Sequence, residues 1–241
     1  AEDISLNARQ PKKIVDLDEV IRQKSARVYR MLPRFVVHWL EKIIHQDGLN
    51  YILTKYEDQE GLEFIESVLN EFGLRVDSDG AMGWDPKGRY IFVANHPLGG
   101  MDGMAFMMVV GRYFPEVVFP VNDFLLYLPN IRNLFIPINK HGRNPELIKL
   151  LDDTFASDKT ILYFPAGLCS RSQHGEILDL EWKKTFVTKA RLHQRDIVPV
   201  HITGRNSAFF YRLANLRKSL HIHFNFEMIL LVDEMFKQKG K

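Results

Sequence analysis

Hydrophobic positions follow a helical spacing in the first part of this chain and form short buried runs in the rest. Up to residue 76, apolar side chains recur every three or four positions, which is typical of amphipathic helices. The first predicted helix is capped by Asp16 or Asp18 and runs to Met31. Further helices are predicted over 33–45, 49–56 and 61–72.

The pattern changes after residues 77–88, a stretch rich in Gly and Asp that predicts a loop. Beyond it, strands are predicted over 90–94, 117–121, 134–138, 160–164, 197–202 and 221–226. Helices are predicted between them over 101–113, 145–156, 182–193, 207–218 and 227–237. The alternation predicts an α/β fold with a mostly parallel central sheet flanked by helices. We therefore expect an N-terminal helical region over 1–76 and an α/β domain over 77–241.

Composition narrows the class of protein. The apolar fraction of 46% can fill a core, and a net charge of +2 gives the whole chain no bias toward nucleic acid. The single cysteine, Cys169, excludes an internal disulfide. The longest apolar runs, such as Met104–Val110, are far shorter than the ~20 residues that span a bilayer.

One N-terminal stretch combines cations with aromatic and aliphatic side chains. Five Lys or Arg residues and no acid lie between Ile21 and Arg34, and an apolar helix centred on Trp39 follows. This arrangement suits a helix at a membrane surface, where cations meet anionic lipid and rings lie at the headgroup boundary. It equally suits a helical hairpin that packs on the main domain with its cations in solvent.

Candidate catalytic residues follow the first predicted strand of the α/β part. Asn95 and His96 come directly after it, Gly99 and Gly100 form a turn, and Asp102 opens the next helix. The carboxyl ends of strands in open α/β folds are where sites form. A carboxylate that fixes a histidine leaves the second ring nitrogen to act as a general base.

The loops after the later strands carry cations and glycines. Lys140 and Arg143 follow the strand over 134–138, and Gly167, Ser170 and Arg171 follow the strand over 160–164. Guanidinium, ammonium, hydroxyl and backbone amide groups together suit an anion such as phosphate. Because these loops leave the same edge of the sheet, we expect one shared cleft that joins His96 to several anion-binding groups.

The residues at these strand ends resemble the motif blocks of a known family. The blocks are Asn95-His96 with Asp102, Leu134-Phe-Ile-Pro-Ile-Asn-Lys140, Phe164-Pro-Ala-Gly167 and Ile197-Val-Pro-Val200. Their order and spacing are similar to those of lysophospholipid acyltransferases of the 1-acylglycerol-3-phosphate acyltransferase type. The residues over 96–103 and 164–171 look most like a bacterial branch that includes hemolysin-like proteins and aminolipid acyltransferases.

The resemblance implies a mechanism and its residues. His96 would take a proton from an acceptor hydroxyl, Asp102 would orient His96, and the alkoxide would attack an acyl thioester on coenzyme A or acyl carrier protein. Neither a metal nor a covalent enzyme intermediate is implied. Asn95, Gly99, Gly100, Lys140, Arg143, Gly167, Ser170 and Arg171 are the residues expected to bind substrate. Lys140 stands where the family has an arginine that grips the acceptor's phosphate.

Departures from the family pattern point to a changed acceptor. Five residues, not the usual four, separate His96 from Asp102. The double glycine can absorb the extra residue and turn a free amide toward a developing oxyanion. Ala166 stands where the family usually has glutamate. We expect an aminolipid or another lysolipid in place of plain lysophosphatidic acid.

The resemblance also implies a place of action. Family members meet their lipid at the membrane surface, so we expect peripheral contact with the cytoplasmic face of a bacterial inner membrane. Two other functions remain open from the residues alone. A thioesterase or lipid hydrolase would use the same His–Asp pair on water, and a lipid-binding module would use no catalysis.

Overall fold

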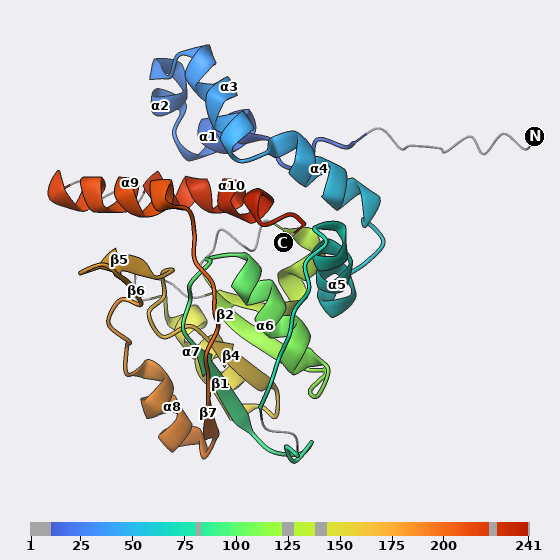
Figure 1. The fold of residues 1–241 in the computed structure, drawn as a ribbon. Coiled ribbons are helices and arrows are strands. Elements are labelled where there is room, and N and C mark those ends of the chain that lie inside the picture. The colour runs from blue at the N-terminus through green and yellow to red at the C-terminus, as the bar shows by residue number, and fades with distance from the viewer. Residues whose placement is uncertain (1–10, 81–82, 122–127, 138–143, 222–225, 241) are drawn as a thin grey trace, which may run out of the picture. The chain divides into compact units, whose positions relative to one another are not determined.

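The computed structural model describes residues 11–80, 83–121, 128–137, 144–221 and 226–240. The chain divides into two compact units, residues 1–59 and residues 60–241. The N-terminal unit is helical and the second unit carries the sheet (Figure 1). No helix in the described ranges is both long and apolar enough to cross a bilayer.

The first unit contains α1 (Leu17–Lys24), α2 (Ala26–Met31), α3 (Arg34–Ile43) and α4 (Gln46–Lys55). Asp16 caps α1 by accepting a hydrogen bond from the Glu19 amide at 3.3 Å. The single helix predicted to Met31 is in fact two helices, because Ser25 is extended (φ −160°, ψ 96°) and ends α1.

A polar face of α4 holds this unit together. Gln46, Asn50 and Thr54 lie one turn apart and are buried. Asn50 accepts from the Val15 amide at 2.7 Å and donates to the Val15 carbonyl at 2.9 Å. Thr54 accepts from the Lys12 amide at 2.8 Å. Side chains thus supply the hydrogen bonds that the extended segment before α1 would otherwise lack.

The sheet of the second unit is parallel throughout, which confirms the predicted α/β class. Its strand order is β3-β2-β4-β1-β7. The strands are β1 (Tyr90–Ala94), β2 (Val117–Val121), β3 (Phe135–Pro137), β4 (Thr160–Tyr163) and β7 (Asp196–Val200). The strand predicted over 221–226 falls mainly outside the described residues. Its described ends are a turn at His221 and the start of a 3₁₀ helix, η3 (Phe226–Ile229).

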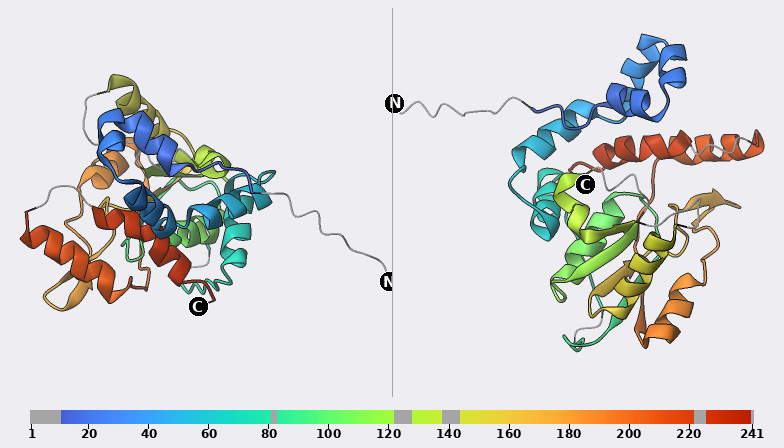
Figure 2. Two further views of the ribbon diagram at one scale, coloured as in Figure 1. Left: turned by 90° about the horizontal axis from the view of Figure 1, so that it is seen from above. Right: turned by 180° about the vertical axis from the view of Figure 1, so that it is seen from behind.

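Helices cover both faces of the sheet because its strands are apolar on both sides. Ile91 and Val93 of β1 join a buried cluster with Phe155 of α7 (Pro145–Ala156) and Phe186 of α8 (Thr185–His193). The opposite face packs on α6 (Met101–Gly111) and the residues after it, where Phe92 meets Phe114 at 5.8 Å. Figure 2 shows α7 in yellow and α8 in orange on the face opposite α6.

Further elements lie beyond the carboxyl ends of the strands, among them α9 (Ala208–Ser219) and α10 (Leu230–Lys237) (Figure 1). A hairpin of β5 (Arg171–Gln173) and β6 (Glu176–Leu178), which the sequence pattern did not predict, joins them there. The buried Glu227 pairs with Arg171 at 3.0 Å and with Arg217 at 2.8 Å, linking the hairpin to η3 and α9.

The boundary between the units lies earlier than the predicted one at 76/77. Helix α5 (Gly61–Glu71) belongs to the second unit, together with the 3₁₀ helix η2 (Pro129–Leu134) against which it packs. Phe72, at the end of α5, meets Phe236 of α10 at 5.1 Å and accepts from the Gly240 amide at 2.7 Å. Helical periodicity alone cannot show with which unit a helix packs.

Candidate active site

The fold brings His96 and Asp102 into direct contact. His96 follows the buried strand β1, and Asp102 is the second residue of α6. The His96 Nδ1 and the Asp102 Oδ2 are 3.0 Å apart, with side-chain exposures of 13% and 0%. A carboxylate only accepts, so Nδ1 carries the proton and Nε2 remains free to act as a base.

Asp102 is ionised and held by main-chain donors. Its Oδ2 accepts from the amides of Leu98 at 2.8 Å and Gly99 at 3.2 Å, and its Oδ1 accepts from Gly103 at 2.9 Å. Burial by itself would raise the pKa of Asp102, but His96 and the amides of Leu98 and Gly99 outweigh it, and the pKa is lowered. The Gly99 amide is therefore committed to Asp102, and an amide of the double-glycine turn that faces an oxyanion stays a prediction for Gly100.

Glycine is required at one position of this turn. Gly99 has φ +88°, and a Cβ built on it would lie 2.8 Å from the Leu231 side chain of α10. Gly100 has φ −136° and precedes α6 as its N-cap residue. The left-handed Gly99 thus absorbs the extra residue between His96 and Asp102 and lets α10 lie directly on the turn.

The imidazole plane is fixed by a neighbouring ring. Phe164, which follows β4, stacks on His96 with ring centroids 3.9 Å apart and an interplanar angle of 22°. Phe164 in turn contacts Phe106 of α6 at 5.8 Å and Phe119 of β2 at 5.0 Å. The half-buried ring that steadies His96 is therefore itself held by two core rings.

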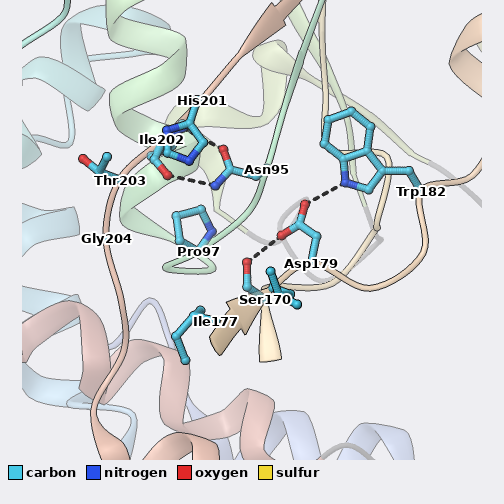
Figure 3. Close-up of a pocket in the computed structure, with 11 residues that line it drawn as sticks. Asn95, Pro97, Ser170, Ile177, Asp179, Trp182, His201, Ile202, Thr203 and Gly204 are labelled. Carbon is cyan, nitrogen blue, oxygen red and sulfur yellow. Dashed lines mark hydrogen bonds between the residues drawn. The ribbon is translucent and has the colours of Figure 1, made fainter. Parts of the chain in front are cut away.

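The main chain of His96 is held by residues from the third block and the hairpin. The His96 amide donates to Asp179 Oδ1 at 3.1 Å, and the His96 carbonyl accepts from the Ser170 amide at 2.7 Å. Asp179 also accepts from the Ser170 hydroxyl at 2.5 Å and from the Trp182 indole at 2.8 Å (Figure 3). The sequence pattern gave no signal for Asp179, because the hairpin before it was not predicted.

A pocket of about 390 Å³ is lined by Asn95 and Pro97, the chain neighbours of His96, but not by His96 itself. It is lined by Asn95, Pro97, Ser170, Ile177, Leu178, Asp179, Trp182 and residues 201–204. Asn95 Nδ2 donates to the Ile202 carbonyl at 2.8 Å, and Asn95 Oδ1 accepts from the Ile202 amide at 2.7 Å (Figure 3). Asn95 therefore joins two strand ends that form the pocket wall.

The predicted anion-binding residues have different environments in the structure. Lys140 and Arg143 lie outside the described residues. Arg171 is buried and paired with Glu227, so its guanidinium is committed to that carboxylate and does not line the pocket. Gly167 adopts φ +68° in the turn after Phe164. The Lys183 ammonium, which the sequence pattern did not single out, lies 3.9 Å from a Cβ built on Gly167.

Cys169 is unsuited to act as a nucleophile although it lies in this loop. Its side chain is buried, and burial raises the pKa of the thiol to about 11 despite the nearby Arg171. At neutral pH it is a thiol and not a thiolate.

A histidine paired with a buried carboxylate at the carboxyl edge of a parallel sheet, next in sequence to pocket-lining residues, has the groups that acid–base chemistry needs. Comparison with known proteins gives the family. A profile of the acyltransferase family matches residues 19–241.

This chain therefore belongs to the acyltransferase family, and the enzyme class predicted from the motif blocks is confirmed. Two relatives are each 45% identical over 230 residues, which cover 95% of this chain. They are the lyso-glycine lipid O-acyltransferases of Bacteroides thetaiotaomicron, with 85% of its length covered, and of Phocaeicola vulgatus, with 82% covered.

Proposed function

We propose that this enzyme acylates a hydroxyl of a lysolipid whose head group is glycine, using an acyl thioester as donor. The observation that carries the proposal is the 3.0 Å contact between His96 and the fully buried Asp102. The names of the two relatives support the acceptor class. Acyl-coenzyme A and acyl carrier protein are both suitable donors, because both present the same thioester.

The proposed chemistry uses His96 as the general base. Its Nε2 removes the proton from the acceptor hydroxyl as the oxygen attacks the thioester carbonyl. The C–O bond forms, the tetrahedral intermediate collapses, and the C–S bond breaks. The leaving thiolate takes the proton back from the imidazolium. Asp102 supports the imidazolium throughout, because its carboxylate remains ionised against Nδ1.

A cationic side chain near the Gly167 turn could bind the head group of the acceptor. A glycine that is linked through its nitrogen keeps a free carboxylate, which ammonium groups bind well. Lys183 is exposed beside this turn, and no acidic side chain of the described residues pairs with it. Its main-chain amide donates to Pro165 at 3.1 Å, which fixes it next to the loop that carries Phe164. Lys140 and Arg143 stay predictions for the same role.

The test is product analysis with matched histidine variants. The enzyme is incubated with acyl-coenzyme A or acyl carrier protein thioesters and a panel of lysolipids, and products are identified by mass. Acylated glycine lipid is the expected product, and His96→Ala should lower its rate about 10²–10⁴-fold. His193→Ala is the control: it removes another histidine that is paired with an aspartate, and it should not lower the rate. Free fatty acid as the main product would indicate a thioesterase, and an unchanged rate in His96→Ala would contradict the proposed base.

We also propose that α3 contacts the membrane surface at the cytoplasmic face. Phe35 and Trp39 lie one turn apart on this helix and are 75% and 59% exposed, and Met31 is 73% exposed. Trp39→Glu should weaken binding to vesicles that contain phosphatidylglycerol, as measured by sedimentation. Tyr51→Glu adds the same charge to α4 and should weaken binding less. Equal binding by the wild type and Trp39→Glu would contradict the proposal.

A further inference from the structure

We propose that Asp179 is a positioning residue for the reaction: it fixes the main chain of His96 and ties that position to the wall of the adjoining pocket. This inference rests on the proposed role of His96 as the base. Asp179 lies directly after β6, and its carboxylate accepts hydrogen bonds from three separate residues. Figure 3 shows two of them, from Ser170 and Trp182.

The first contact gives the His96 amide, which lies just beyond β1, a hydrogen-bond acceptor. The β1–β7 pairing stops at Ala94, so the His96 amide has no strand partner on that side. Pro97 follows and favours an extended backbone at His96. Asp179 Oδ1 accepts this amide at 3.1 Å. A charged acceptor at the main chain is a stronger hold than a neutral one.

The second contact closes a ring of hydrogen bonds around His96. The Ser170 hydroxyl donates to the same Asp179 oxygen at 2.5 Å, while the Ser170 amide donates to the His96 carbonyl at 2.7 Å. The His96 amide is therefore tied to the Asp179 side chain, and the His96 carbonyl is tied to the main chain of Ser170, whose hydroxyl binds the same Asp179 oxygen. Asp102 and Phe164 fix only the imidazole, whereas Asp179 and Ser170 fix the backbone that carries it.

The third contact, between Asp179 and Trp182, links the hydrogen bonds around His96 to the pocket. Asp179 Oδ2 accepts from the Trp182 indole at 2.8 Å, and Trp182 and Asp179 both line the pocket. Trp182 also packs edge-on against Phe186 of α8, with centroids 6.1 Å apart. A group that binds in the pocket therefore touches the residues that set the position of His96. A misplacement of the base by about 1 Å costs roughly 10²-fold in rate.

The test uses Asp179 variants alone and combined with His96→Ala. Asp179→Ala should lower kcat about 10- to 100-fold, with the KM for the acyl thioester changed less than about twofold. Asp179→Asn keeps an oxygen for the His96 amide and the Ser170 hydroxyl, so it should recover most of kcat. In a His96→Ala background, Asp179→Ala should cause no further loss, because its effect passes through His96.

Asp152→Ala is the control, because Asp152 also joins donors from another helix but lies on α7, away from the pocket. Its kcat should equal that of the wild type. An equal loss from Asp179→Ala in both backgrounds, or no recovery in Asp179→Asn, would overturn the inference. If Asp179→Ala does not fold by circular dichroism, Ser170→Ala replaces it. It should lower kcat several-fold only where His96 is present, and the same loss in both backgrounds would overturn the inference.

The result separates the two proposals. If His96→Ala itself retains full activity, the proposed base is wrong whatever the Asp179 variants show. If His96→Ala loses activity and Asp179→Ala does not, the base stands and only the positioning role of Asp179 fails.

Discussion

Two histidine–carboxylate pairs among the described residues of the second unit have the same separation and very different surroundings. His96 Nδ1 lies 3.0 Å from Asp102, and His193 Nε2 lies 3.0 Å from Asp152. Asp102 is fully buried and accepts three main-chain amides, whereas the Asp152 side chain is 43% exposed and also binds Lys189. The chain neighbours of His96 line a pocket, and the His193–Asp152 pair joins α7 to α8.

The difference teaches that contact distance alone does not identify a catalytic pair. In both pairs the carboxylate's pKa is lowered, but for different reasons. Asp152 responds first to the Lys189 ammonium and then to His193, both at a solvent-exposed site. Asp102 must overcome its own burial and does so through His96 and fixed amides. Water screens the exposed His193–Asp152 pair, whereas main-chain amides hold the buried His96–Asp102 pair.

The largest expected effect comes from removing one charge of the buried pair. Asp102→Asn presents an amide that can donate to Nδ1, which places the proton on Nε2 and blocks its action as a base. We expect kcat to fall about 10²–10⁴-fold. Asp152→Asn makes the same chemical change at the exposed pair and should leave kcat unchanged. Initial rates of both variants, with melting curves to show folding, check this, and a fully active Asp102→Asn would contradict it.

A smaller effect should follow from the turn that supplies amides to Asp102. Gly99→Ala forces an L residue into φ +88° and brings its Cβ to 2.8 Å from Leu231. Gly175 is the matched control, since it has φ +89° but no heavy atom within 4 Å of a built Cβ. Gly99→Ala should lower the free energy of unfolding by about 1–3 kcal/mol more than Gly175→Ala, because the overlap adds to the strain. An equal loss of unfolding free energy in the two variants, measured by urea denaturation, would show that Leu231 of α10 can move aside at no cost.

The smallest expected effect is on the pH dependence of stability. The pKa of Asp102 is lowered from its ordinary value of 3.8, so folding favours the carboxylate. Its contribution is present above that ordinary value and is lost as the pH falls through the lower folded-state pKa. The difference in unfolding free energy between the wild type and Asp102→Asn should therefore shrink in strong acid. The difference for Asp152→Asn should be smaller throughout, and denaturation curves across this range measure both.

The sequence predicted best what local patterns determine. The bounds predicted for β1, β2 and α7 agree with the structure, because each is a continuous apolar run or has Asn144 and Pro145 at its start. Parallel strands that are buried on both faces leave a clear apolar signature. The contact between His96 and Asp102 was predictable because both lie in one short turn.

Contacts between distant parts of the chain were not predictable in this way. The partner of Arg171 is Glu227, 56 residues away, and no local pattern distinguishes a buried guanidinium from one that awaits an anion. The β5–β6 hairpin is largely polar, so it lacks the alternation that marks a strand, and Asp179 was missed with it. The break at Ser25 depends on a single residue's conformation.

The Asn95 side chain makes the two hydrogen bonds that a backbone peptide group would make in the sheet. The last residue pair between β1 and β7 is Ala94 with Val200, and the Asn95 amide then bonds both polar atoms of Ile202. The side chain thereby adds one rung to a ladder whose two backbones have already begun to part. Aspartate could not replace it, because it has no N–H to offer the Ile202 carbonyl. A carboxamide thus holds together two segments that line the pocket, just beyond the end of the sheet.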